Sequence, residues 1–326
     1  MGNNFSTHAN QIRIASPSHA HKSINFAFMK TALLCLIGAC CCLAAFAQPY
    51  PIGHVSLTMV DAARQNREVT CEVYYPAETA GDNTAFSKTL LGKAPAIAFG
   101  HGFVMRWDAY QNIWEAVVPH GYIMVLPTTE ASFSPHHDAQ GQDLAFVLQQ
   151  LQKEGRNPGS PLYGHVDTMT CVMGHSMGGG SSFLAAAGHP EIKAIATLAP
   201  AETGPSAIAA AKKIAIPALI FAGLNDCITP PDKHQLPMYE ALASPSKCYI
   251  GIKGGSHCLM ADKSVTCGFG EGACKPKPEI TREAQHELID KYLIPWLDCH
   301  LKHDLDAGTS FSNLLKNDTA IVFKTR

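Results

Sequence analysis

The chain has 326 residues, of which 46% are hydrophobic and 16% charged, and its formal net charge is -2. So much apolar material builds a large core, and so low a charged fraction excludes an intrinsically disordered chain. A near-neutral chain without a basic run also lacks the electrostatic footprint of a nucleic-acid-binding protein. Small neutral or apolar partners suit this composition better than polyanions.

The first 47 residues differ from the rest and predict an export signal. A polar leader precedes Met29 and Lys30, and an apolar run from Thr31 to Phe46 leads to Ala47. A basic residue, a short apolar run and a small residue at the end are typical of a secretory signal, so we expect cleavage before Gln48. The run is too short for a transmembrane helix. Met29 alone would open a complete signal, which makes it an alternative start.

The predicted compartment is therefore extracellular or periplasmic. A loose lipoprotein cleavage box at Ile37 to Cys40 makes a lipid anchor the less favoured alternative. An even number of cysteines in an oxidising compartment predicts disulfides, although eight allow 105 pairings. No two of the eight cysteines after the leader are spaced as C-x-x-C, so we expect no metal site. The eight that follow the leader are Cys71, Cys171, Cys227, Cys248, Cys258, Cys267, Cys274 and Cys299.

Residues 48–326 contain no internal repeat or low-complexity linker and predict one α/β domain. Helical patterns such as "QDLAFVLQQLQKEG" alternate with short apolar runs, as in a mostly parallel sheet with helices on both faces. Ligands of such sheets bind at the carboxyl ends of the strands. The predicted strands are His54 to Val60, Val69 to Tyr75, Ala94 to Phe99, Tyr122 to Leu126, Met169 to Met173, Ile192 to Leu198, Pro217 to Ala222 and Cys248 to Lys253.

The segment "TMTCVMGHSMGGGSSFLAAAG" (168–188) contains the strongest motif of the chain. Gly174-His175-Ser176-Met177-Gly178 fits G-x-S-x-G, a nucleophile elbow that needs a strand before it and a helix after it. Side chains at Gly174 or Gly178 would collide with neighbouring backbone. Each further glycine costs about 1 kcal/mol of helix propensity, so we expect close helix–sheet approach, or room for substrate, to require Gly179 and Gly180.

A serine nucleophile needs a base that is oriented by a third group, and on such a sheet the chain order is Ser, acid, His. Asp226 follows a predicted strand in "IPALIFAGLNDCITP", and His257 lies in the Gly-Gly-Ser loop of "CYIGIKGGSHCLMAD". Glu202 in "LAPAE" is the alternative acid. His136 and His137 are interpreted as polar loop residues rather than metal ligands.

Ester chemistry also needs donors for the oxyanion, each worth about 3 kcal/mol. The strand "AIAFGHGF" turns on Gly100 and Gly102, so we assign the oxyanion hole to the backbone amides of Phe103 and Met177. His101 is a turn residue whose ring could also pack beneath the site.

The segments "VMGHSMGGG", "HGF", "GLNDCITP" and "IKGGSHC" resemble α/β-hydrolase esterases, the group of bacterial cutinases, polyester hydrolases and chlorophyllase-like enzymes. The resemblance runs from Glu72 to Asp262. It implies the α/β-hydrolase fold, Ser176 as nucleophile with Asp226 and His257 as partners, an oxyanion hole at Phe103 and Met177, and no cofactor.

Departures from the resemblance concern the substrate. In the cutinase and polyester-hydrolase branch, a tryptophan follows "LAP" and forms an aromatic clamp with the residue at Phe103. Ala201 stands there in this chain, which argues against polyester hydrolysis and leaves simple ester hydrolysis open. The insert from Cys267 to Pro278 and the tail after His303 have no evident counterparts, and we expect them to cover and narrow the site.

Some relatives resemble this chain in placing cysteines on the loops of the acid and the base. The resemblance therefore suggests a disulfide between Cys227 and Cys258. The alternatives are two unpaired thiols beside the cleft, or pairing with Cys267 or Cys274. Cys171 is interpreted as a core residue.

The favoured function is a secreted serine hydrolase that cleaves small-molecule or lipid-like carboxylic esters through an acyl-enzyme. Cutinase-like, lipase or acyltransferase activity is the alternative, and a non-catalytic binding protein is disfavoured because all three triad positions are occupied.

Overall fold

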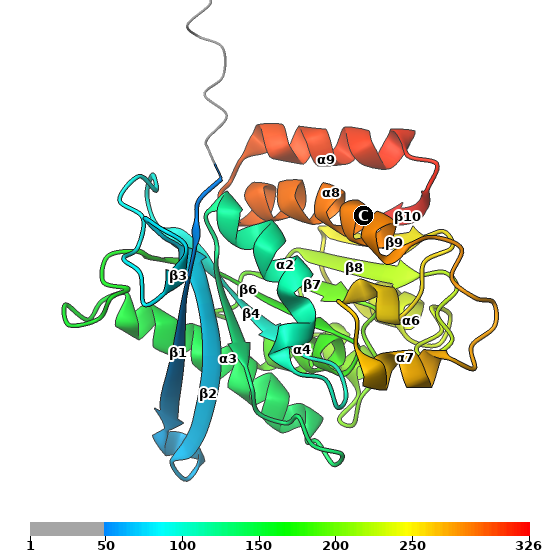
Figure 1. Ribbon diagram of the computed structural model, residues 1–326. Helices are drawn as coiled ribbons and strands as arrows, with labels where there is room; N and C mark the ends of the chain where they lie inside the picture. The colour runs from blue at the N-terminus through cyan, green and yellow to red at the C-terminus, as the bar shows by residue number, and fades with distance from the viewer. Residues whose placement is uncertain (1–48) are drawn as a thin grey trace, which may run out of the picture. The chain divides into compact units, whose positions relative to one another are not determined.

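A ten-stranded sheet organises the residues that the computed structural model describes, 49–326. Its strand order is β10-β9-β8-β7-β6-β4-β5-β2-β1-β3 (Figure 1). The predicted signal and its cleavage point lie outside the described residues. The strands are β1 (Ile52–Asp61), β2 (Arg67–Pro76), β3 (Gly81–Asp82), β4 (Ala94–Gly100), β5 (Ile123–Pro127), β6 (Val166–His175), β7 (Ala194–Leu198), β8 (Ala218–Gly223), β9 (Lys247–Ile252) and β10 (Ile321–Thr325).

All strands predicted from the apolar runs are present. β1 and β2 pair in antiparallel register, with Ile52 opposite Pro76, and the pairs from β4 and β5 across to β8 and β9 are parallel. Every residue of β4, β5, β7, β8 and β9 is buried. Strands covered on both faces read as continuous apolar runs, and the sequence could therefore locate them.

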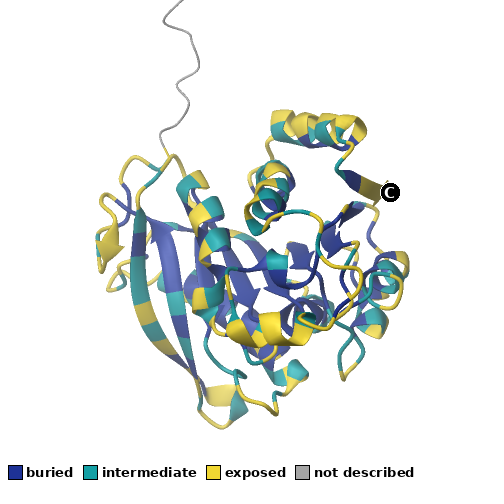
Figure 2. Cartoon of the chain, turned by 45° about the vertical axis from the view of Figure 1, so that its right-hand side comes forward, coloured by how far each residue is buried: buried dark blue, intermediate teal, exposed yellow. Residues whose placement is uncertain are grey.

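Helices cover both faces of the sheet, and the side chains of each strand alternate between two cores. Ala96 and Ala98 of β4 face the core under α3 to α6, whereas Ile97 and Phe99 face the core under α2 and α8. Figure 2 shows the strands buried between these layers. The helices are α2 (Gln111–Val117), α3 (His137–Glu154), α4 (Met177–Gly188), α5 (Ala207–Ala211), α6 (Gln235–Ala241), α7 (Val265–Glu271), α8 (Arg282–Leu301) and α9 (Leu305–Asn317).

The tail after His303 lies away from the predicted site. It forms α9, which packs on α8, and β10, which pairs with β9 at the edge of the sheet. The expectation that this tail covers the site is wrong, since the tail supplies an edge strand and a helix that completes the core under α8. None of the helices within residues 49–326 is long and apolar enough to cross a membrane.

Candidate active site

Ser176 lies at the turn between β6 and α4. Its backbone adopts φ 55° and ψ −119°, a region that costs a non-glycine residue about 1–3 kcal/mol and that clusters at functional sites. Such geometry is that of a nucleophile elbow, where the strained turn lifts the serine above the sheet edge.

Helix α4 begins with glycines, which have low helix propensity, because no side chain fits where it packs. A Cβ on Gly174 would collide with the backbone of Gly178, and a Cβ on Gly178 would collide with the Gly100 carbonyl. A Cβ on Gly180 would meet the Ala201 carbonyl oxygen. The first turn of α4 therefore lies directly against the end of β4 and the loop after β7, and of the two reasons expected from the sequence, close approach is the one observed.

Asp226 and His257 form a buried pair at the neighbouring strand ends. Asp226 follows β8, His257 follows β9, and the His257 Nδ1 atom lies 2.8 Å from Asp226 Oδ2. The carboxylate accepts two backbone amides through Oδ1, from Ile228 and Thr229, each at 2.8 Å. Nδ1–H therefore donates to the carboxylate, which leaves Nε2 as the free acceptor of the neutral ring.

Thr229 is a member of this cluster that the sequence analysis missed. Its hydroxyl donates to Asp226 Oδ2 at 2.8 Å and lies 3.0 Å from His257 Nδ1. An aspartate whose side chain accepts amides two and three residues later is an Asx-type turn, and "DCIT" was the available signal. The alternative acid, Glu202, instead accepts the Ile208 amide at 2.9 Å, and no hydrogen bond joins it to His257 among the described residues.

The predicted oxyanion donors belong to two segments beside Ser176. Met177 is the first residue of α4, where amides have no intrahelical partner. Phe103 lies in the turn after β4, and neither amide donates to another backbone group among the described residues. Val104 follows with φ 54°, a conformation that is an outlier for a β-branched residue.

A buried chain of hydrogen bonds runs beneath the elbow. The Gly102 amide donates to the Tyr110 hydroxyl at 2.7 Å, Tyr110 lies 3.0 Å from His175 Nδ1, and His175 Nε2 lies 3.2 Å from the His257 carbonyl oxygen. Since only Nε2–H can bond that carbonyl, Nδ1 accepts from Tyr110. Burial holds the pKa of His175 well below its ordinary value, which keeps the ring neutral. His175, the variable residue of the elbow, thus links the turn at Gly102 to the loop of His257.

The other histidines singled out in the sequence, His101, His136 and His137, take no part in this series of hydrogen bonds. The His101 ring is buried, with Nε2 2.7 Å from the Thr129 carbonyl oxygen. His136 is exposed, and His137 accepts the Gly204 amide at 3.3 Å.

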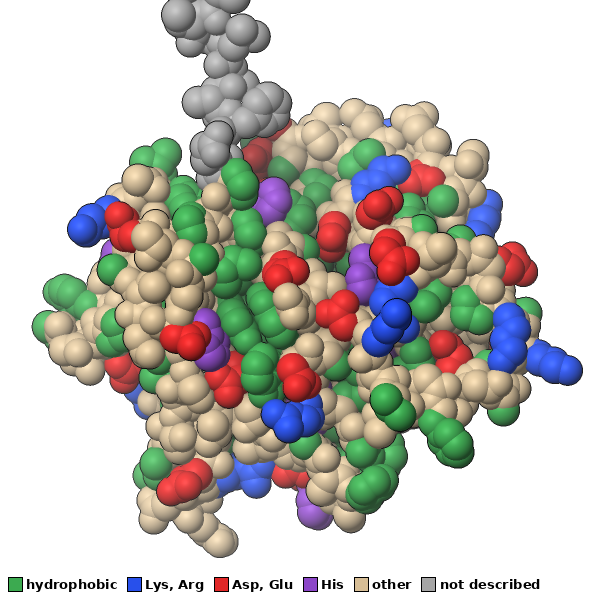
Figure 3. Space-filling view, viewed as in Figure 1, with side chains coloured by type: hydrophobic (Ala, Val, Ile, Leu, Met, Phe, Trp, Pro, Cys, Tyr) green, Lys and Arg blue, Asp and Glu red, His purple; other side chains and the backbone are tan. Residues whose placement is uncertain are grey.

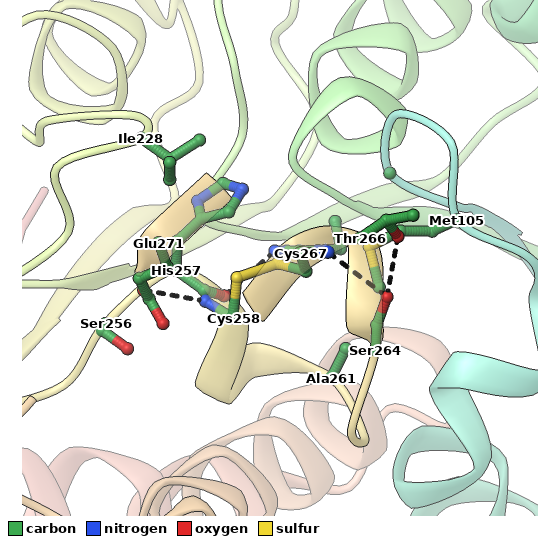
Figure 4. Close-up of a disulfide and its surroundings, with 12 residues drawn as sticks. Met105, Ile228, Ser256, His257, Cys258, Ala261, Ser264, Thr266, Cys267 and Glu271 are labelled. Carbon is green, nitrogen blue, oxygen red and sulfur yellow. Dashed lines mark hydrogen bonds between the residues drawn. A yellow bond between two sulfur atoms is a disulfide. The ribbon is translucent and has the colours of Figure 1, made fainter. Parts of the chain in front are cut away.

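The disulfides differ from the suggested pair. Cys227 bonds to Cys274 and Cys258 bonds to Cys267, so the proposed Cys227–Cys258 link is wrong. Each loop cysteine is paired with the inserted segment around α7 instead of with the other loop, as Figure 4 shows for Cys258. The insert supplies two cysteines close to the two loops and takes both partners.

Ser176 and His257 line one cavity of about 510 Å³. No hydrogen bond joins the Ser176 hydroxyl to the His257 ring within the described residues; catalytic hydrogen bonds of this kind often tighten only in the transition-state complex. The rest of the lining is almost entirely apolar: Phe103, Val104, Met105, Phe133, Ile228, Val265, Thr266, Cys267, Phe269 and Gly270. An apolar cavity with few polar groups is the usual form of a small-molecule site.

A strand-to-helix serine turn at the edge of a mostly parallel sheet, with an acid and a histidine after later strands, defines an α/β-hydrolase. The family profile "PETase: PET hydrolase-like" matches residues 44–273. The chain belongs to this PET hydrolase-like family.

Named relatives agree with this assignment. The chain is 27% identical to cutinase est2 of Thermobifida alba over 245 residues, 74% of this chain and 66% of the relative. It is 26% identical to cutinase 1 of Thermobifida cellulosilytica, over 76% of that protein. A bis(hydroxyethyl) terephthalate hydrolase of Streptomyces coelicolor is also 26% identical, over 64% of its length. The chain thus spans about two thirds of the first relative's length.

Proposed function

We propose that this protein is an exported serine hydrolase that cleaves carboxylic esters through an acyl-enzyme on Ser176. The observation that carries the proposal is the Asp226–His257 hydrogen bond beside a cavity that His257 and the strained serine line together. The three groups come from three different strand ends, where the ligands of such sheets bind.

The first half-reaction forms the acyl-enzyme. The Ser176 oxygen attacks the ester carbonyl carbon while its proton passes to His257 Nε2, and the carbonyl becomes an oxyanion. The amides of Phe103 and Met177 stabilise that charge. When the intermediate collapses, the carbon–oxygen bond to the alcohol breaks and the His257 proton leaves with the alcohol.

The second half-reaction reverses these roles with water. His257 removes a proton from water, the resulting hydroxide attacks the acyl carbon, and Ser176 regains its proton as the acid departs. Asp226 orients the imidazole and stabilises its charged form. Its carboxylate accepts bonds from two amides and the Thr229 hydroxyl, which fix its orientation.

The lining of the cavity supports an apolar, small or lipid-like ester as the substrate. The side chains that line it are apolar apart from those of Ser176, His257 and Thr266. Ala201 packs its carbonyl against Gly180 and brings no aromatic ring to the site, so we favour simple esters over polyesters. We propose water as the acceptor of the acyl group, because no group in the cavity lining would select an alcohol in its place.

The proposal is tested with p-nitrophenyl esters from acetate to palmitate. We expect wild-type activity and a fall to background in Ser176→Ala, while Ser312→Ala, an exposed serine on α9, remains fully active. Equal activity of wild type and Ser176→Ala on every ester would refute the nucleophile. Adding an alcohol and analysing the products separates hydrolysis from acyl transfer.

Export is tested separately. The leader is proposed to be removed before Gln48, so peptide mass spectrometry of protein recovered outside the cytoplasm should find an N-terminal peptide that begins at Gln48 or its cyclised form. Retention of the leader, or a lipid on Cys40, would contradict this part of the proposal.

A further inference from the structure

Helix α7 presents apolar side chains to solvent at the mouth of the cavity. Val265 is 91% exposed and Phe269 is 89% exposed, although both line the cavity with Ser176. Residues four apart lie on the same face of a helix, so the two form one apolar ridge. Phe133 is 83% exposed and Phe103 is 51% exposed, and these two side chains and the ridge together form an apolar rim around the cavity.

The rim is a cluster of exposed apolar side chains that do not belong to either hydrophobic core. Hydrophobic side chains gather over and below α7 in the space-filling view (Figure 3). Clustered exposed apolar groups mark interaction sites, whereas scattered ones are ordinary. Since the rim is continuous with the cavity that holds Ser176, the partner that fits it is the substrate itself.

Helix α7 and the residues directly after it are tied to the His257 loop and to the Asp226 loop of the proposed catalytic site. Cys267 is bonded to Cys258, next to the base, and Cys274 to Cys227, next to the acid. The Cys258 amide also donates to the Glu271 carboxylate at 3.1 Å (Figure 4).

A third tie reaches the oxyanion loop. The Thr266 hydroxyl donates to the Val104 carbonyl oxygen at 3.3 Å, directly after Phe103. Covalent and polar ties to all three loops hold the ridge at a constant position relative to Ser176, and a preorganised wall loses little entropy when it binds a ligand.

We propose that α7 is the specificity-determining wall of the site and that its ridge, Val265 and Phe269, binds the aliphatic chain of a long-chain ester. This inference rests on the proposed ester hydrolysis and names the substrate class. Short esters fill only the inner cavity, whereas a long chain extends along the ridge and removes both side chains from water.

The first test compares kcat/KM for p-nitrophenyl decanoate and acetate, which differ in the acyl chain, and for decyl and ethyl acetate, which differ in the alcohol. In Phe269→Ala we expect the long-to-short ratio to fall about tenfold in one of the two series, equivalent to about 1.4 kcal/mol. The series that responds identifies the side of the ester that lies on the ridge. Phe323→Ala, on β10 and 41% exposed, is the matched control and should leave both ratios unchanged.

The second test does not depend on turnover. In the Ser176→Ala background, binding of p-nitrophenyl decanoate and decyl acetate is measured with and without Phe269→Ala, and we expect the Kd of one of them to rise about tenfold. Unchanged ratios in an active enzyme overturn the role of α7 while the proposed function stands. An inactive wild type refutes the proposed function, and an unchanged Kd for both esters then overturns the ridge as well. Phe269 is almost fully exposed, so its truncation leaves the core intact.

Discussion

Replacing Tyr110 with phenylalanine tests whether the buried hydrogen-bond chain positions the proposed catalytic groups. The substitution keeps the ring and removes one hydroxyl. That hydroxyl accepts the Gly102 amide and bonds His175 Nδ1, and both partners are buried. These two groups lose their partner, together with a weaker contact to the Met105 sulfur at 3.3 Å, and the core keeps its volume.

The size of the effect follows from those two groups. A buried donor or acceptor left unpaired costs about 1–3 kcal/mol, so Tyr110→Phe should lower the free energy of unfolding by about 2–6 kcal/mol at most. The Gly102 amide precedes the proposed donor Phe103, and its release lets that donor move. Since deletion of one oxyanion donor lowers kcat by about 10²–10³, we expect a displaced donor to lower kcat by about 10–100-fold with little change in KM.

The assay pairs ester kinetics with a boronic acid, which forms a tetrahedral adduct with the serine and fills the oxyanion hole. We expect Tyr110→Phe to raise the boronate Kd in parallel with the fall in kcat/KM. A merely structural loss would lower the unfolding energy and leave both constants at wild-type values in the folded fraction. Tyr163→Phe, at 52% exposure, is the matched control. Wild-type kcat and boronate affinity in folded Tyr110→Phe would refute the reasoning.

Three further predictions follow. Gly178→Ala should destabilise the fold by about 1–3 kcal/mol or more, because its Cβ overlaps the Gly100 carbonyl; urea denaturation measures this, and a neutral effect contradicts the close approach. Thr229→Val should lower kcat by about tenfold, since a hydrogen bond to a charged group is worth about 1.5–3 kcal/mol; an unchanged rate shows that the two amides alone orient Asp226. The pKa of His175 lies below its ordinary 6.5 in the fold, so the unfolded chain binds this proton at a higher pH than the folded chain does. The contribution of His175 to the free energy of unfolding is therefore fully present above pH 6.5 and is lost as the pH falls below that value. The slope should reach about 1.4 kcal/mol per pH unit for this group and be shallower in His175→Gln, and a pH-independent unfolding energy would contradict it.

The sequence determined those features that depend on local patterns. Apolar runs bounded by glycine or proline located the strands because fully covered strands are apolar throughout. The G-x-S-x-G motif located the turn at Ser176 because only glycine at Gly174 and Gly178 lets the strand and helix approach so closely. Asp226 and His257 could be chosen from the sequence because each lies directly after a predicted strand, in the chain order serine, acid, histidine.

Tertiary structure alone decided the features that join distant segments. Cys227 pairs with Cys274, 47 residues away, and Tyr110 meets His175, 65 residues away; no periodicity predicts such pairs. Helix α7 has seven residues and two internal glycines, too short and too weak a helical signal to be located from propensity. Its position comes from the Cys258–Cys267 disulfide within it, the Cys227–Cys274 disulfide directly after it and its contacts with the site loops. A segment without a repeating apolar pattern is placed only by what it packs against.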